Sequence, residues 1–159
     1  MSTTLLIIVA TICSTITMTT FSYLLSYFIK KQYREPELLN LLICKSKFIP
    51  IEASKNHPLG WIIHFSIGLV FDAVLILLWS NYSLSSSWQS GVYLGIVLGI
   101  IGSIGWTLFF KTIYKPSHID FWYFVHLIIA HIIFVLTALA LYKINRFYIE
   151  FRESNSLFK

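Results

Sequence analysis

Four long stretches of the chain are almost entirely apolar, and short polar segments separate them. They lie at residues 3–29, 59–82, 90–110 and 119–142. A helix needs about 20 consecutive apolar residues to cross the hydrocarbon core of a bilayer, and each stretch reaches that length. The apolar residues form continuous runs rather than the alternating pattern of strands. The pattern therefore predicts an all-α fold: a four-helix transmembrane bundle that forms one integral membrane domain over residues 1–159.

The polar loop at residues 30–58 contains a short apolar run of its own. Pro36 precedes the sequence E-L-L-N-L-L-I-C-K, and proline is favoured in the first turn of a helix. The run at residues 38–43 is far too short to span a bilayer. Lysines on both sides of it would attract anionic lipid. We therefore expect a short interfacial amphipathic helix in this first cytoplasmic loop.

Hydroxyl side chains follow one face of the first apolar stretch. Their spacings of seven, four, seven and four residues place them on one stripe, which consists of Thr4, Thr11, Thr15, Ser22 and Ser26, with Thr19 beside it. Small hydroxyl residues allow membrane helices to approach closely and to share hydrogen bonds. The stripe is expected to face the second or the fourth stretch, either as a packing surface or as the lining of a polar pathway.

The third stretch carries glycines on one helical face. Gly91, Gly95 and Gly99 are four residues apart, and Gly102 continues the face. This pattern is typical of a surface on which another helix packs closely, within the monomer or between copies of the chain. The alternative is that the glycines unwind the helix to form a substrate site, as in transporters. No proline accompanies them, which favours helix packing.

Four ionisable residues lie inside the apolar stretches, where they are costly and mark either a polar network or a function. His64 and Asp72 belong to the second stretch, and His126 and His131 belong to the fourth. Both stretches run in the same direction, so a rise of about 1.5 Å per residue compares their depths. His64 matches His126 in depth, and Asp72 matches His131. These four residues form the candidate intramembrane polar site.

Three interpretations of this site stay open. Asp72 could be protonated, paired with a histidine or hydrogen-bonded to threonines of the first stretch, simply to fix the helix register. The carboxyl group and the histidines could instead relay protons. His64 and His126 could also hold a divalent metal ion or a haem b, although no cofactor is predicted outside this alternative.

No catalytic motif is present. The sequence has no H-E-x-x-H, no G-x-S-x-G and no repeated acidic motif for reactions on phosphate. We therefore expect no catalytic residues. His57 and His118 flank the apolar stretches and are expected to be solvated. Cys13 and Cys44 lie at different depths, so a disulfide is not expected.

Composition agrees with a membrane protein. The chain is 57% hydrophobic and 12% charged, whereas about a quarter of the residues of a soluble domain are charged. The net charge of +5 comes from basic residues that flank the apolar stretches, so nucleic acid is not an expected partner.

The distribution of Lys and Arg predicts the orientation. The loop at residues 30–58 contains six of them, the turn at 111–120 two and the tail at 143–159 four. The N-terminus and the loop after the second stretch contain none. Because basic loops stay on the cytoplasmic side, both chain ends are expected outside.

The order of three motifs carries a resemblance to a known group of proteins. The first stretch contains T-M-T-T-F-S-Y, the second contains H-P-L-G-W-I-I-H-F-S-I-G-L-V-F, and the fourth contains F-V-H-L-I-I-A-H-I-I-F. With the glycine-rich third stretch, this order resembles small four-helix inner-membrane proteins of bacteria that are grouped only as domains of unknown function. The resemblance covers most of the chain. It implies a four-helix fold in the bacterial inner membrane and no particular activity.

The sequence thus predicts a small multi-pass inner-membrane protein with a structural or accessory role. The alternative is a protein that handles protons, a metal ion or haem with the His and Asp residues between the second and fourth stretches. The lipid bilayer is the expected partner, together with a second copy of the chain or another membrane protein.

Overall fold

The computed structural model describes residues 1–82, 84–117 and 119–156. Over these residues the chain is all-α. The helices are α1 (Thr3–Ile29), α2 (Glu35–Lys45), α3 (Pro58–Asn81), α4 (Trp88–Thr112) and α5 (Phe121–Ser156). All except α2 are long and apolar enough to cross a membrane. The predicted four-helix bundle with one additional short helix is confirmed.

Local sequence explains where the long helices begin and end. Ser2, His57 and Ser87 are the N-caps of α1, α3 and α4, and each side chain accepts a hydrogen bond from a backbone N–H of the first turn. α1 ends at Lys30, whose φ of 55° is left-handed and closes the helix. α5 has no such stop after residue 142, so the predicted tail continues the same helix as far as Ser156.

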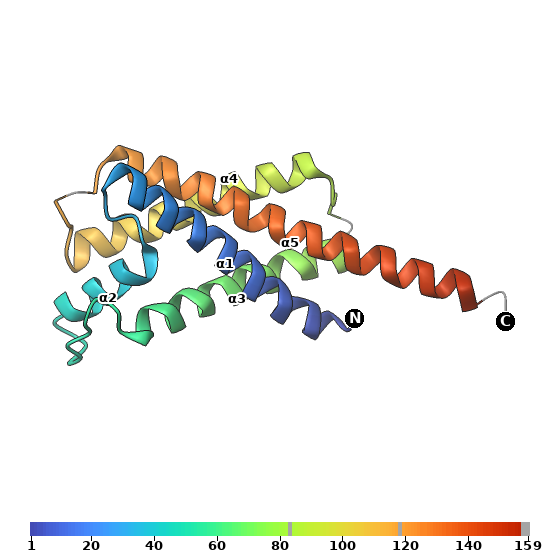
Figure 1. Cartoon of the computed structure of the whole chain (residues 1–159), viewed down its shortest axis with the longest axis horizontal. Helices are drawn as coiled ribbons and strands as arrows, with labels where there is room; N and C mark the ends of the chain where they lie inside the picture. Colours follow the sequence, from blue (N-terminus) through green and yellow to red (C-terminus); the bar gives the residue numbers. More distant parts are fainter. Residues whose placement is uncertain (83, 118, 157–159) are drawn as a thin grey trace.

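The long helices form a row in the order α4, α5, α1, α3 (Figure 1). α5 packs against α4 on one side and α1 on the other, and α1 packs against α3. α3 and α4 follow each other in sequence, but over the described residues they touch at isolated points at most. Successive spans alternate in direction, so the two chain ends lie at one end of the bundle and α5 projects beyond it (Figure 1).

Two clusters of buried apolar side chains divide the interior. The first lies towards the chain ends and is centred on α1, α3 and α5; its members include Leu6, Ala10, Ile76, Val135 and Leu139. The second lies at the opposite end and includes Tyr33, Leu38, Trp106, Tyr123 and Leu127. We call these the terminal cluster and the α2 cluster. The candidate site lies where the two meet.

α2 lies across the end of the bundle where α1 ends and α3 begins (Figure 1). The sequence predicts that α2 lies at the membrane interface as an amphipathic helix, but Leu38, Leu39 and Leu42 are at most 6% exposed and pack in the α2 cluster. The row of long helices leaves this end of the interior uncovered, and burial of the α2 leucines fills it. The short helix is therefore present where predicted, but it closes the bundle.

Asn40 fastens α2 to the start of α3. Its amide nitrogen donates to the carbonyl groups of Lys55 and His57 at 3.0 and 2.7 Å. Its amide oxygen accepts a hydrogen bond from the Gly60 N–H at 2.8 Å. A side chain at Gly60 would collide with the carbonyl oxygen of Pro36. This close contact brings the first turn of α2, with Glu35, against the bundle interior.

Candidate functional site

The hydroxyl-bearing side of α1 faces the bundle interior, as predicted. Except for Thr4, which is exposed, the members of the stripe are at most 5% exposed: Thr11, Thr15, Thr19, Ser22 and Ser26. α1 lies between α3 and α5. Its hydroxyl groups are therefore available to the ionisable residues of both neighbours.

Two of the predicted histidines bind α1 through these hydroxyls. His64 Nε2 of α3 lies 3.0 Å from Thr19 Oγ1, and His126 Nε2 of α5 lies 2.9 Å from Ser22 Oγ. The His126 ring also stacks on Phe21 of α1, with centroids 5.7 Å apart. α1 thus holds His64 and His126 on its two sides, and no hydrogen bond joins one histidine to the other.

Glu35 is a site residue that the sequence interpretation missed. It is 1% exposed, although it belongs to the loop between the first two spans. Its Oε1 accepts a hydrogen bond from Ser22 Oγ at 2.8 Å and lies 3.8 Å from His126 Nε2. Its Oε2 is buried without a hydrogen-bond partner among the described residues. Burial raises the pKa of the Glu35 carboxyl to about 8.

A polar group at the α2 end connects this cluster to the bundle surface. Lys31 forms an ion pair with Asp120, and their side chains are 40% and 39% exposed. Tyr33 Oη donates to Asp120 Oδ1 at 2.9 Å, and its ring stacks 5.1 Å from that of His126. The hydrogen bond from Lys31 lowers the pKa of Asp120, and burial raises that of Tyr33 to about 12. Polar contacts thus extend from the surface to Tyr33, and ring stacking joins Tyr33 to the buried histidine.

A cavity of about 210 Å³ lies beside the cluster, in the space between α3 and α4. Thr15, Glu35, His64 and His131 contribute its polar wall. Ile67 of α3 and Ile101 and Phe109 of α4 line it as well, and each is more than two-fifths exposed. Because α3 and α4 do not pack together, the cavity opens sideways through the bundle surface that faces the apolar part of the membrane.

His131 of α5 also lines the cavity. Its Nδ1 lies 2.7 Å from the carbonyl oxygen of Leu127, one turn earlier on α5. A carbonyl oxygen only accepts, so Nδ1 carries the proton and Nε2 of the neutral ring is an acceptor. His131 is within electrostatic range of both His64 and His126. His64 and His131 therefore line the same cavity, whereas His126 is not among its lining residues.

Asp72 lies apart from this region. It is fully buried and has the Ser14 hydroxyl of α1 beside it. Over the described residues, neither of its carboxyl oxygens nor Ser14 Oγ has a hydrogen bond of ordinary geometry. The depth comparison pairs Asp72 with His131, but no ion pair or hydrogen bond joins the two side chains. Asp72 is also outside the cavity lining.

The predicted glycine face packs within the monomer, against α5. A Cβ atom added at Gly95 would lie 2.5 Å from Ile132 Cα, and one at Gly99 would lie 2.6 Å from Ile128 Cα. Gly91 faces the side chains of α5 leucines, and Gly102 faces the ring of His131.

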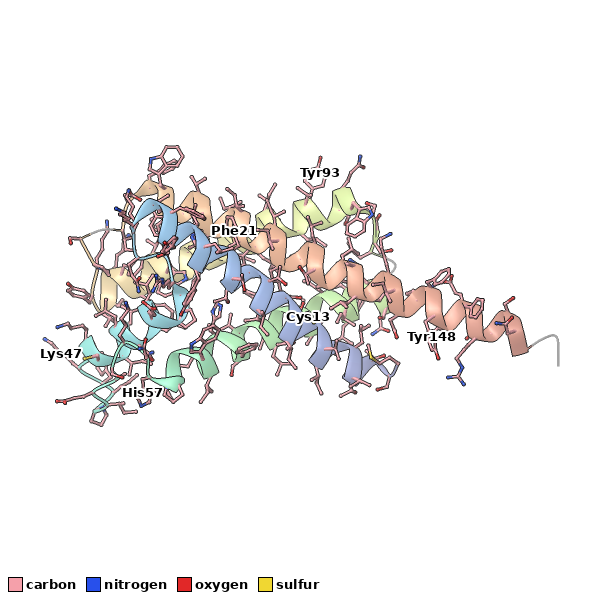
Figure 2. All side chains as sticks on the ribbon, viewed as in Figure 1. Cys13, Phe21, Lys47, His57, Tyr93 and Tyr148 are labelled. Atoms are coloured by element: carbon pink, nitrogen blue, oxygen red, sulfur yellow. The ribbon has the colours of Figure 1, made fainter. Side chains whose placement is uncertain are left out.

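Metal-type clusters are absent from residues 1–82, 84–117 and 119–156, which bring no three His, Cys, Asp or Glu side chains together as ligands. Cys13 and Cys44 are free. His57 is half-buried at the α2 end (Figure 2), where it caps α3. His118, which was also expected to be solvated, lies outside the described residues.

No family model, no curated protein and no solved structure matches the chain. The four long apolar helices indicate a multi-pass membrane protein, and its activity has to be inferred from the site.

Proposed function

We propose that this chain is a proton-responsive membrane protein, in which the cluster of Glu35, Ser22 and His126 takes up and releases a proton inside the bundle. One observation supports the proposal above the others. A fully buried carboxyl group shares a serine hydroxyl with a buried histidine, and the ring of Tyr33, whose hydroxyl donates to the partly exposed Asp120, stacks on that histidine. A cluster that only fixed helix register would not need this connection.

The groups around Glu35 come from every element that packs on it. α1 contributes Ser22, and α5 contributes His126 and Tyr123, whose buried hydroxyl has no hydrogen-bond partner among the described residues. His64 of α3 and His131 of α5 share the cavity with Glu35. Lys and Arg side chains are absent from the cavity lining. Burial without a fixed positive charge favours the protonated carboxyl group.

The polar contacts favour uptake from one side over transport across the membrane. They begin at the α2 end and continue on α1 through Ser22 and Thr19, whereas Asp72 lies beyond them. Beyond Asp72 the interior is the terminal cluster, whose core includes Ile76, Ala138 and Leu139 at 0% exposure. Among the described residues a proton therefore has a route into the bundle but no polar route out at the other end. This favours an accessory or sensing role over that of a pump.

The pH dependence of stability tests the proposal. The pKa of Glu35 is about 8 in the folded chain and about 4.5 without burial. Between these values the folded state holds a proton that the unfolded state has released. Stability should therefore be greatest near pH 5 and fall as the pH rises to 8, by up to about 1.4 kcal/mol per pH unit. The measurement is the thermal midpoint of the purified protein in detergent, in buffers from pH 5 to 9.

Two variants isolate the contribution of Glu35. Glu35→Gln keeps the acceptor for Ser22 and cannot ionise, so its midpoint should fall much less over this pH range. Glu52→Gln removes a carboxyl group from an exposed loop position and should follow the wild type. Parallel curves for wild type and Glu35→Gln would refute the proposal. If the wild type carried a proton flux in proteoliposomes and Glu35→Gln abolished it, the function would be proton transport and not sensing.

We further infer the placement in the bacterial inner membrane with both chain ends outside. The count of Lys and Arg supports this orientation, and the two ends do lie at one end of the bundle (Figure 1). Cys44 is exposed in the last turn of α2, whereas Cys13 lies within a span. A membrane-impermeant maleimide should label Cys44 in permeabilised cells and not in intact spheroplasts. Labelling of Cys44 in both preparations would show that both chain ends lie inside.

A further inference from the structure

The cavity between α3 and α4 has the size of a small ring compound. Its volume is about 210 Å³, whereas an engineered protein cavity of about 150 Å³ holds a benzene molecule. There is thus room for one six-membered ring with one or two substituents. Phe71, Trp106 and Phe134 form part of the wall, and aromatic side chains pack well against flat rings.

The polar wall of the cavity carries atoms that no protein group satisfies. Thr15 Oγ1 and Glu35 Oε2 are buried without a hydrogen-bond partner in the described part of the chain. His64 uses Nε2 for Thr19, and His131 uses Nδ1 for the Leu127 carbonyl. His64 Nδ1 and His131 Nε2 have no hydrogen-bond partner among those residues. Buried polar atoms are normally paired, so the unpaired Thr15 Oγ1 and Glu35 Oε2 in the cavity lining indicate a ligand with polar atoms of its own.

The proton positions restrict the ligand further. Glu35 Oε1 accepts from Ser22, so a protonated Glu35 presents a donor at Oε2. His131 presents an acceptor at Nε2. A donor and an acceptor that line the same cavity complement a hydroxyl group, which accepts one hydrogen bond and donates another. A carbonyl oxygen on a ring would satisfy the donor alone.

The opening of the cavity indicates where the ligand comes from. Ile67, Ile101 and Phe109 line it and are 41%, 49% and 43% exposed on the apolar surface of the bundle. The α2 end is closed by packed side chains of the α2 cluster. A ligand dissolved in the membrane can enter sideways between α3 and α4, and an apolar tail can stay in the lipid while the ring is bound.

We propose that the cavity between α3 and α4 binds a membrane-soluble ring compound with a hydroxyl or carbonyl oxygen, of the phenol, quinol or quinone class. Glu35 and His131 hold the ring oxygen, and Thr15 and His64 offer further hydrogen bonds to a second oxygen. The ring packs against the aromatic wall. This binding uses side chains of the proton-responsive cluster but does not require a proton to move.

Trp106 provides a local probe because it is the tryptophan in the cavity wall. The five tryptophans of the chain can be replaced biosynthetically by 5-fluorotryptophan and observed by fluorine NMR in nanodiscs. The variant Trp106→Phe identifies the Trp106 resonance. Three probes of similar shape are titrated: 4-propylphenol, 2-propyl-1,4-benzoquinone and propylbenzene. The exposed Trp88 at the other end of the bundle is the internal control.

The phenol or the quinone should shift the Trp106 resonance saturably, and propylbenzene should bind at least about tenfold more weakly because it makes no hydrogen bonds. A preference for the phenol assigns a hydroxyl ligand, and a preference for the quinone assigns a carbonyl ligand. His131→Phe should remove the difference in affinity between 4-propylphenol and propylbenzene. Propylbenzene should still shift the Trp106 resonance of this variant, which would show that the variant is folded.

Two results would overturn the proposal. Equal affinity for all three probes would show an apolar cavity that does not recognise oxygen. No shift of Trp106 with any probe, in a protein whose other resonances are dispersed, would show that no ring enters. Failure of the proton-responsive role is detected separately, because it appears as parallel pH–stability curves for wild type and Glu35→Gln with probe binding intact.

Discussion

The two sides of α4 contrast with each other, although the same residue type controls both. Towards α5, Gly95 and Gly99 bring the two helix backbones into direct contact. Towards α3, Gly105 has no atom within 4 Å of an added Cβ and lines the cavity. One side of the helix is closed as tightly as a helix pair permits, and the other is held open.

The spacing of the glycines explains the contrast. Gly91, Gly95 and Gly99 are four residues apart, whereas Gly102 and Gly105 follow at intervals of three. At about 100° per residue, six residues turn the helix by about 240° beyond one full turn, so Gly105 lies about 120° away from Gly99 around the axis. The change from four to three therefore moves the glycines from the α5 contact to the cavity. A glycine run in a span can thus both close one contact and form an opening.

The largest loss of stability is expected at Gly99, in the contact between α4 and α5. The variant Gly99→Leu would place a side chain where even a Cβ lies 2.6 Å from Ile128 Cα. Backbone atoms cannot move aside as a side-chain end can, so α4 and α5 must separate. We expect a loss of at least about 3 kcal/mol of unfolding free energy, measured by chemical unfolding in mixed micelles. Wild-type stability would show that the α4–α5 contact is not the closed side of the bundle.

The spans and the glycine contact are predictable from sequence because each depends on local spacing. Run length identifies a helix that can cross the bilayer, and a four-residue repeat identifies one face. The burial of Glu35 is not predictable in this way. A carboxyl group among lysines in a loop is normally solvated, and only the packing of α2 across the bundle end brings it to Ser22 and His126.

The predicted pairing of ionisable residues also shows that sequence spacing does not give the packing around a side chain. Rise per residue gives the depth of a side chain but not the direction in which it points. His126 and His131 are five residues apart, and their partners differ accordingly: Ser22 of α1 for His126 and the Leu127 carbonyl for His131. Asp72 has Ser14 beside it instead of a histidine. Hydroxyl groups on α1, rather than depth-matched partners, arrange the site.

An intermediate effect is expected at Gly102, between the two regions. A Cβ there would lie 2.9 Å from His131 Cε1 and 3.0 Å from Nε2. The ring can give way only by straining its hydrogen bond to the Leu127 carbonyl. For Gly102→Ala we expect a loss of about 1 kcal/mol in the same unfolding measurement. Because the displaced atom is the acceptor proposed for the ring oxygen, binding of 4-propylphenol should weaken more than that of propylbenzene.

The smallest effect on stability is expected at Gly105, where the helix side is open. Gly105→Ala meets no atom within 4 Å, so its unfolding free energy should stay within about 0.5 kcal/mol of the wild type. Gly105→Leu should also fold, but its longer side chain would occupy the space between α3 and α4 and weaken the Trp106 shift for all three probes. The two variants separate the presence of the cavity from the integrity of the fold. If Gly105→Ala destabilised the protein as strongly as Gly99→Leu, Gly105 would have to be in a tight contact. The cavity between α3 and α4 would then not be open.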